Sequence, residues 1–256
     1  MMGSAMDRPE IIVVDDPAAL AERAAHAVVD AALDAVKRQG RFTLALAGGN
    51  TPRTTYQRLA QSPLRERLPW DRTWIFFGDE RGVPPTHGDS NYRMANEALL
   101  SKVPIPDGQV VRIRGEAEDP EAAAAEYAKR IADVFQSKRG ELPRFDLILL
   151  GMGVDGHTAS LFPGSPVLKE VFRPVAAVHA GAASIPQRFT FTFPLINAAA
   201  RVMFLVAGGE KAKVLKAVLT EPGSGLPSSM VQPTNGRLVW LLDRPAAALL
   251  GPAQTH

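Results

Sequence analysis

Short apolar runs recur along the chain, and each of them is bounded by glycine, proline or charged residues. Such runs are typical of β-strands buried in an α/β protein, because a strand covered on both faces needs no alternation of polar and apolar residues. The run at 188–193 differs, since polar and aromatic residues alternate in it. The predicted strands span 11–14, 42–46, 73–77, 110–112, 145–150, 173–178, 188–193, 201–206 and 237–242, with the weakest pattern at 110–112.

Segments with apolar residues at helical spacing lie between these runs. Asp16-Pro17 supplies an N-cap and a first-turn proline for a helix that Gly40 ends. Asp119-Pro120 starts a second long helix in the same way, and we expect it to reach about residue 138. Further helices are predicted from Pro52, over 91–100, and from the 207–211 loop to residue 219.

Strands and helices alternate without a break in composition, an internal repeat or a low-complexity linker. This order predicts a single domain over residues 11–250, with a three-layer α/β/α architecture and a mostly parallel, Rossmann-like open sheet. Residues 1–10 precede the first predicted strand, and we expect them to be disordered.

The composition of the chain excludes several classes of protein. Among 256 residues, 46% are hydrophobic, the net charge is +2, and no basic stripe is interleaved with aromatic residues, so nucleic acid is not an expected partner. There are no cysteines and the five histidines are scattered, so we predict neither disulfides nor a metal site. No apolar run reaches the roughly 18 residues of a membrane span. With no apolar signal-peptide core near the N-terminus, these features predict a cytoplasmic protein.

A glycine-rich stretch follows the predicted strand at 145–150 and carries the strongest candidate chemistry. Three glycines between 151 and 156 permit a sharp turn and bring main-chain amides close to a ligand. Asp155 and His157 follow two residues apart. Open α/β sheets place their ligands at the carboxyl ends of the strands, so we interpret this pair as functional rather than as a tight turn with a solvated histidine.

The same stretch matches the dinucleotide pattern G-x-G-x-x-G at 151–156, but its surroundings exclude that function. A dinucleotide site needs a helix after the glycines and an acidic residue roughly 20 positions on. Pro163 and Pro166 prevent the helix, and the strand predicted at 173–178 ends in His179 without a carboxylate. We therefore expect no NAD and no other cofactor.

Three further loops carry polar groups at strand ends. Gly48-Gly49-Asn50-Thr51 precedes Pro52, and amides at a helix N-terminus suit a phosphate, although an ordinary βα turn has the same sequence pattern. The charged residues at 79–81 indicate either a solvated loop or a site. Lys211 lies in a first helical turn, where the helix dipole disfavours a cation, so a bound anion would explain it as well as plain surface exposure does.

Taken together, three of these motifs resemble the 6-phosphogluconolactonases. The matching stretches are 47–52, 77–84 and 151–163, and the order of the flanking elements agrees from about residue 11 to residue 242. The first motif is shared with the glucosamine/galactosamine-6-phosphate isomerase and deaminase group of the same superfamily. In the deaminases a glutamate that assists sugar ring opening occupies the position of Phe162, so the third motif favours the lactonases.

The resemblance implies a hydrolase of carbohydrate metabolism that converts 6-phospho-D-glucono-1,5-lactone to 6-phospho-D-gluconate, the second step of the oxidative pentose phosphate pathway. The residue types fit this reaction: His157 is suited to activate water, because imidazole titrates near neutrality. Asp155 or Asp79 is suited to orient the ring, and Arg81 to stabilise an oxyanion or a carboxylate. No G-x-S-x-G motif is present, so a covalent acyl-enzyme is not expected.

The resemblance also implies where the substrate binds. The 6-phosphate is expected against one βα loop and two distant cations, and the sugar against two further residues. The implied phosphate ligands are Gly48, Gly49, Asn50, Thr51, Arg188 and Lys211; the implied sugar ligands are Asn91, for which a helix-capping role is an equal alternative, and Gly153.

Two alternatives come from other classes of function. A sugar-phosphate isomerase or deaminase of the same fold would conflict with Phe162. A non-catalytic sugar-phosphate sensor would need a helix-turn-helix segment, for which the chain has no spare length, and would not need His157. The sequence does not distinguish a monomer from a homodimer.

Overall fold

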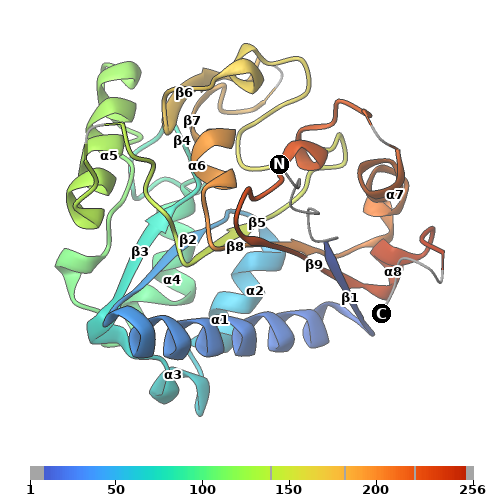
Figure 1. Ribbon diagram of the computed structural model, residues 1–256, viewed down its shortest axis with the longest axis horizontal. Helices are drawn as coiled ribbons and strands as arrows, with labels where there is room; N and C mark the ends of the chain where they lie inside the picture. Colours follow the sequence, from blue (N-terminus) through green and yellow to red (C-terminus); the bar gives the residue numbers. More distant parts are fainter. Residues whose placement is uncertain (1–8, 139, 182, 222, 252–256) are drawn as a thin grey trace, which may run out of the picture.

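The computed structural model describes residues 9–138, 140–181, 183–221 and 223–251. Its main feature is a six-stranded sheet in the order β1-β9-β8-β5-β2-β3, and every neighbouring pair of strands is parallel. This sheet, with helices packed around it, confirms the predicted fold class (Figure 1). The strands are β1 (Glu10–Val14), β2 (Phe42–Leu46), β3 (Thr73–Phe77), β5 (Leu147–Leu150), β8 (Arg201–Val206) and β9 (Arg237–Asp243).

Two adjacent inner strands of the sheet, β2 and β5, are buried along their whole length. Every residue of β2 and of β5 is buried, as expected for parallel strands covered on both faces. The strand predicted at 145–150 begins only at Leu147, because the backbone N–H of Asp146 donates to Oγ1 of Thr43 at 3.0 Å and not to a neighbouring strand. The expected disordered segment at 1–10 also needs correction at its end, since β1 begins at Glu10, while residues 1–8 lie outside the described part of the chain.

Helices cover the sheet on both sides, with α1 and α2 on one face and α6 on the other (Figure 1). Local sequence explains their ends: Asp16 accepts a hydrogen bond from the N–H of Ala19 at the start of α1, and Gly40 ends it in a left-handed conformation. Helix α5 stops before the predicted residue 138, because Gln136 adopts a left-handed conformation. The helices are α1 (Pro17–Gln39), α2 (Asn50–Leu59), α3 (Leu64–Arg67), α4 (Asn91–Ala98), α5 (Pro120–Phe135), α6 (Phe193–Asn197), α7 (Ala212–Thr220) and α8 (Arg244–Ala247).

A second, three-stranded antiparallel sheet lies beside the main one, in the order β4-β7-β6. It consists of β4 (Asp79–Arg81), β7 (Gln187–Phe191) and β6 (Val175–His179). The sequence predicts no strand at 79–81, because three charged residues give no apolar run. The strand predicted at 110–112 is wrong: Val110 forms an isolated bridge with Ile75 instead.

The order of the strands determines where the polar loops meet. The chain passes from β2 to β3 in one direction and then returns to β5, β8 and β9 on the other side of β2. The direction therefore reverses between β2 and β5, and ligands of open α/β sheets bind at such a point, beyond the carboxyl ends of the strands. The loops that begin at residues 47, 78, 151 and 207 all leave this edge.

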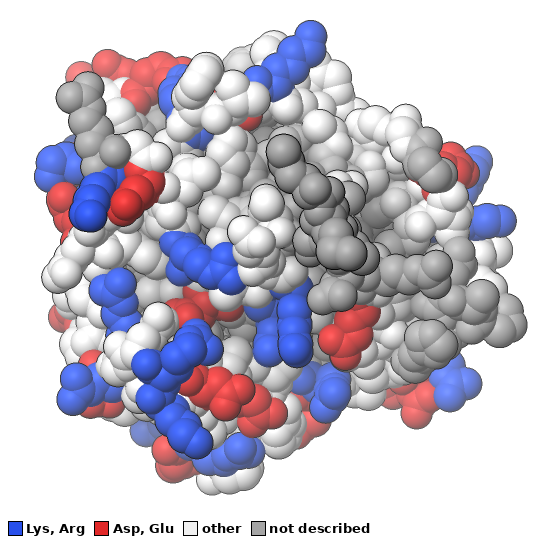
Figure 2. Space-filling view, in the orientation of Figure 1, with Lys and Arg blue, Asp and Glu red and all other residues white. Residues whose placement is uncertain are grey.

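Charges of both signs lie on the surface of the molecule (Figure 2). Lys and Arg side chains alternate with Asp and Glu on the face shown in Figure 2, and they form no single-sign stripe there. None of the helices in the described part of the chain is both long and apolar enough to span a membrane.

Candidate active site

The loop after β5 holds a carboxylate against an imidazole. Oδ1 of Asp155 lies 2.6 Å from Nδ1 of His157 and also accepts the backbone N–H of His157 at 3.2 Å. An ionised carboxylate only accepts hydrogen bonds, so we assign the ring proton to Nδ1. The neutral ring then presents the lone pair of Nε2, which is the atom that a general base uses.

Opposing effects act on the pKa of Asp155. Burial acts to raise the pKa of Asp155, but the hydrogen bond from the backbone N–H of His157 and the charge of its imidazole outweigh burial, so the pKa lies below its usual value. The side chain of His157 is 32% exposed and that of Asp155 is 47% exposed. Asp155 is therefore ionised, and both side chains of the pair are partly open to solvent.

Gly153 makes room for this pair. A Cβ atom at Gly153 would lie 2.1 Å from Nδ1 of His157 and 2.6 Å from Oδ1 of Asp155, which no side chain tolerates. The backbone N–H of Gly153 donates to the carbonyl of His157 at 2.9 Å and closes the loop. The structure thus places Gly153 under the imidazole; its predicted contact with the sugar stays a prediction.

The ring of Phe162 covers the imidazole of His157. The two ring centroids are 4.6 Å apart, with an angle of 38° between the planes. The intervening residues form a tight reversal, in which Thr158 and Leu161 make an antiparallel bridge and Ala159 has a positive φ of 47°. A positive φ is unfavourable for alanine, so the surrounding contacts enforce this turn.

The loop after β2 ends in a helix N-terminus without a side-chain cap. Helix α2 begins at Asn50, with Gly49 as its N-cap at a φ of 98°, which favours glycine. The helix therefore begins two residues before Pro52, where the sequence predicts its start. Because no side chain caps α2, the amides of its first turn are available to an anion, as a phosphate site requires.

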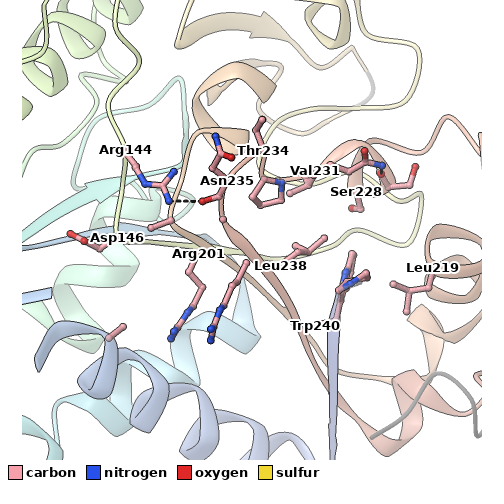
Figure 3. Close-up of a pocket in the computed structure, with 18 of the residues that line it drawn as sticks. Arg144, Asp146, Arg201, Leu219, Ser228, Val231, Thr234, Asn235, Leu238 and Trp240 are labelled. Carbon is pink, nitrogen blue, oxygen red and sulfur yellow. Dashed lines mark hydrogen bonds between the residues drawn. The ribbon is translucent and has the colours of Figure 1, made fainter. Parts of the chain in front are cut away.

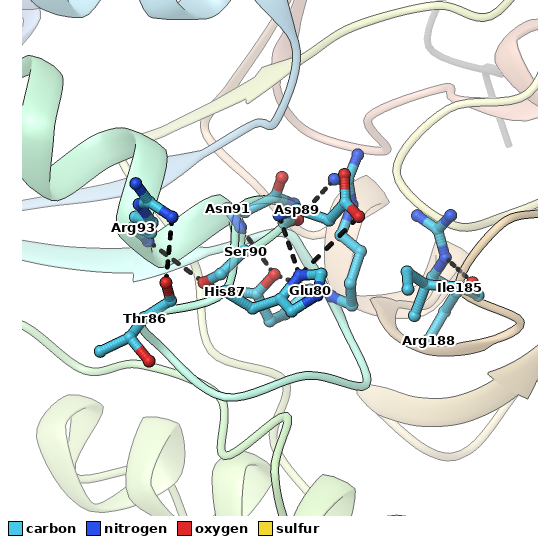
Figure 4. Close-up of polar contacts among 10 residues, drawn as sticks. Glu80, Thr86, His87, Asp89, Ser90, Asn91, Arg93, Ile185 and Arg188 are labelled. Carbon is cyan, nitrogen blue, oxygen red and sulfur yellow. Dashed lines mark hydrogen bonds and ion pairs between the residues drawn. The ribbon is translucent and has the colours of Figure 1, made fainter.

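Arg81 and Arg188 face each other as register partners on β4 and β7. The guanidinium of Arg81 donates from Nη1 to the carbonyl of Asp89 at 2.6 Å, while its buried Nε has no partner among the described residues. Arg188 donates from Nε to the carbonyl of Ile185 at 2.7 Å (Figure 4). Burial lowers the pKa of Arg188, and the charge of Arg81 adds to this effect. Two like charges in register are unfavourable, and an anion between them would relieve the repulsion.

The carboxylates of β4 serve the architecture around this arginine pair. Glu80 accepts the backbone N–H of Asn91 at 2.7 Å (Figure 4). It also accepts that of Tyr92 at 2.9 Å, and thereby caps α4. Burial raises the pKa of Glu80, although these hydrogen bonds oppose the increase. Asp79 is also buried and binds Asn91 and Ser160, so the carboxylate that contacts His157 is Asp155.

Lys211 ends a short 3₁₀ helix and occupies the N-cap position of α7. Val214, one helical turn further on, contacts the loop of His157: a Cβ at Gly156 would lie 3.3 Å from its Cγ2 atom. The same loop is held by Ser228, whose Oγ donates to the carbonyl of Gly156 at 2.9 Å. The first turn of α7 therefore adjoins the loop of His157. The sequence does not indicate Ser228, because a buried serine in a small-residue loop gives no recognisable signal.

Comparison with known proteins identifies the family. The family model for glucosamine-6-phosphate isomerases/6-phosphogluconolactonase matches residues 15–240. This chain belongs to that family. It is 42% identical over 246 residues to the 6-phosphogluconolactonase of Synechocystis sp., which covers 95% of this chain and 99% of that relative.

Two further relatives agree with this assignment. The 6-phosphogluconolactonase of Rattus norvegicus is 41% identical over 253 residues, or 96% of each chain. The solved structure of the 6-phosphogluconolactonase of Trypanosoma cruzi has a TM-score of 0.85 at 32% identity, and covers 97% of this chain and 99% of that one. These comparisons confirm the resemblance to the 6-phosphogluconolactonases over nearly the whole chain.

This family member has a separate cavity at the opposite end of the sheet (Figure 3). Its volume is about 780 Å³, and Asp146, Arg201 and Trp240 are among the residues that line it. Asp146 and Arg201 lie at the amino ends of β5 and β8, and none of the predicted site residues lines this cavity.

Among the described residues, no group of three or more His, Cys, Asp or Glu side chains is arranged to hold a metal ion.

Proposed function

We propose that this enzyme hydrolyses 6-phospho-D-glucono-1,5-lactone to 6-phospho-D-gluconate, as a cytoplasmic enzyme of the oxidative pentose phosphate pathway. One observation carries the proposed chemistry: the 2.6 Å contact between Asp155 and His157 on the loop after β5. Among the relatives, those from Synechocystis and rat bear the name 6-phosphogluconolactonase at about 40% identity over nearly the whole chain.

The proposed mechanism uses His157 as a general base and needs no metal or cofactor. Nε2 takes a proton from a water molecule, whose oxygen attacks the lactone carbonyl carbon. The carbonyl oxygen becomes negative, and Arg81 is proposed to stabilise that charge. The bond between the carbonyl carbon and the ring oxygen then breaks, and the imidazolium returns the proton to the departing ring oxygen. Asp155 orients the ring and stabilises its charged form.

The phosphate is proposed to bind at the free first turn of α2. The amides of Gly49, Asn50 and Thr51 would approach it from one side, beside Gly48. Arg188 and Lys211 would supply the positive charge, and the unfavourable pairing of Arg188 with Arg81 supports this assignment. A guanidinium binds phosphate through two parallel hydrogen bonds, which adds geometric selectivity.

Phe162 separates this function from the isomerase and deaminase alternative. Its ring lies on the imidazole of His157, at the position where the deaminases carry a glutamate for ring opening. A phenylalanine neither donates nor accepts a proton, so this site is suited to hydrolysis rather than to isomerisation.

A stopped-flow assay tests the proposal against spontaneous hydrolysis of the lactone. We expect the protein to accelerate the loss of 6-phosphogluconolactone and to release no ammonia from glucosamine 6-phosphate. Ammonia release with no acceleration of lactone loss would instead establish the deaminase alternative. No activity on either substrate would favour the sensor.

A further inference from the structure

Asn91, the first residue of α4, lies between Gly48 in the loop after β2 and Asp79 on β4. It is 3% exposed, and its Nδ2 donates to Oδ1 of Asp79 and to the backbone carbonyl of Asp79, both at 3.0 Å. Its backbone N–H is held by Glu80 at 2.7 Å. The amide of Asn91 is therefore fixed in position and is engaged with protein atoms.

The other side of this amide lies against Gly48 in the phosphate loop. A Cβ atom at Gly48 would lie 2.2 Å from Oδ1 and 2.8 Å from Nδ2 of Asn91. Gly49 differs, since a Cβ there would meet nothing within 4 Å, but its φ is 98°. Gly48 has no such positive φ. Glycine is thus needed at these two adjacent positions for different reasons. At Gly49 the backbone conformation requires it, and at Gly48 the contact with Asn91 leaves no room for a side chain.

Asp79 extends this contact to the loop of His157. Its second carboxylate oxygen, Oδ2, accepts a hydrogen bond from Oγ of Ser160 at 2.9 Å. The backbone N–H of Ser160 donates to Oγ1 of Thr190 on β7 at 3.2 Å. A buried chain of contacts from Gly48 through Asn91 and Asp79 to Ser160 therefore joins the loops after β2, β3 and β5.

We propose that Asn91 is a positioning residue that holds the phosphate loop in place relative to Arg81 and His157, and that Gly48 lacks a side chain because Asn91 occupies that space. This inference rests on the proposed lactonase function for its catalytic consequence. In this proposal Asn91 supports the loop that binds the phosphate and does not itself bind the sugar. A side chain at Gly48 would push Asn91 off Asp79 or displace the phosphate loop.

A double-mutant cycle of Gly48→Ala and Asn91→Ala tests this proposal, because truncating Asn91 removes the atoms that an alanine at position 48 would meet. In the wild-type background, we expect Gly48→Ala to lower kcat/KM for 6-phosphogluconolactone by about 10²-fold, the scale of a 1 Å misplacement. Asn91→Ala alone should cost about 10-fold, since the loop loses one of its supports. In the Asn91→Ala background, Gly48→Ala should cost less than about 2-fold more.

Two readouts separate positioning from a general loss of structure. The decrease in kcat/KM should come mainly from a higher KM for the phosphorylated lactone. The decrease should be much smaller with D-glucono-1,5-lactone. Binding of inorganic phosphate, measured by thermal shift, should follow the same pattern across the four proteins. The phosphate measurement does not depend on hydrolysis, so it tests this inference even if the wild-type protein proves not to be a lactonase.

The controls are Gly108→Ala, at a glycine whose added Cβ would meet nothing within 4 Å, and Asn96→Ala on the same helix as Asn91. Both should leave kcat/KM unchanged. An equal cost of Gly48→Ala in both backgrounds would overturn the proposal, as would no cost in the wild-type background or no effect of Asn91→Ala. If Gly48→Ala alone does not fold, the double variant tests the proposal. A double variant with the kcat/KM of Asn91→Ala supports the proposal. A double variant that misfolds, or whose kcat/KM is a further 10-fold lower, overturns it.

Discussion

Oδ1 of Asp155 lies 2.6 Å from Nδ1 of His157, and it also accepts the backbone N–H of the same residue. This double contact fixes both the ring and its proton. Asp155→Asn should therefore lower kcat by about 10²-fold, because a misplaced or wrongly protonated ring loses its catalytic geometry. KM should change little. Steady-state kinetics at pH 7 measure both, with Asp133→Asn on the surface of α5 as the control; a kcat within 2-fold of wild type would contradict this role.

The same carboxylate predicts a pH dependence of stability. The pKa of Asp155 is lower in the folded protein than its usual value of 3.8, so its ionised form stabilises the fold above that pH, and this contribution is lost as the pH falls through the folded-state pKa. The difference in free energy of unfolding between wild type and Asp155→Asn should shrink as the pH falls below 3.8. Urea unfolding at neutral and acid pH checks the sign, and a difference that widens in acid would contradict it.

Phe162 should contribute to catalysis through its contact with His157. Phe162→Ala removes the ring that covers the imidazole, and an aromatic pair is worth about 0.5 to 1.5 kcal/mol, so kcat should fall by roughly 2- to 13-fold. Phe162→Tyr keeps the ring and should restore most of kcat. If the alanine and tyrosine variants have the same kcat, ring contact is not the reason for this residue.

The phosphate site should distinguish two substrates. A charge-assisted hydrogen bond is worth about 1.5 to 3 kcal/mol, so Arg188→Ala or Lys211→Ala should lower kcat/KM for the phosphorylated lactone by roughly 10- to 150-fold. The loss with unphosphorylated gluconolactone should be much smaller, since that substrate never made the contact. A merely unstable variant would lose both activities equally. Variants that keep the wild-type preference between the lactones would place the phosphate site elsewhere.

Activity should not depend on a metal ion. The described residues contain no cluster of ligands that could hold one. Exhaustive treatment with EDTA, followed by removal of the chelate, should therefore leave kcat unchanged. Loss of activity that zinc or magnesium restores would reveal a metal site.

The sequence was informative where local physics determines the structure. Buried apolar runs predicted the strands of the parallel sheet, and the residues at 16–17 and 40 defined both ends of α1. It failed at β4, because the burial of Asp79 and Glu80 depends on partners such as Ser160 and Ser90, which come from later in the chain. Propensity does not encode such long-range pairs.

The candidate site shows the same division. Asp155 and His157 are two positions apart, so the sequence indicated a functional pair, but it left Asp79 as an alternative carboxylate until the structure showed the contact with Asp155. The contact of Gly48 with Asn91 was not predictable, since the two residues are brought together by the packing of α2 on α4. Gly48 and Gly49 look alike in the sequence. Only the structure shows that a side chain at Gly48 would collide with Asn91, whereas Gly49 has a positive φ that favours glycine.

The most direct test of the proposed mechanism is the kcat of His157→Ala for 6-phosphogluconolactone, measured by stopped flow in a variant whose circular dichroism and thermal unfolding match the wild type. General acid–base catalysis supplies about 10²- to 10⁴-fold, so kcat should fall by that factor while KM moves little. An unchanged kcat in the folded variant would contradict the assignment of His157 as the base.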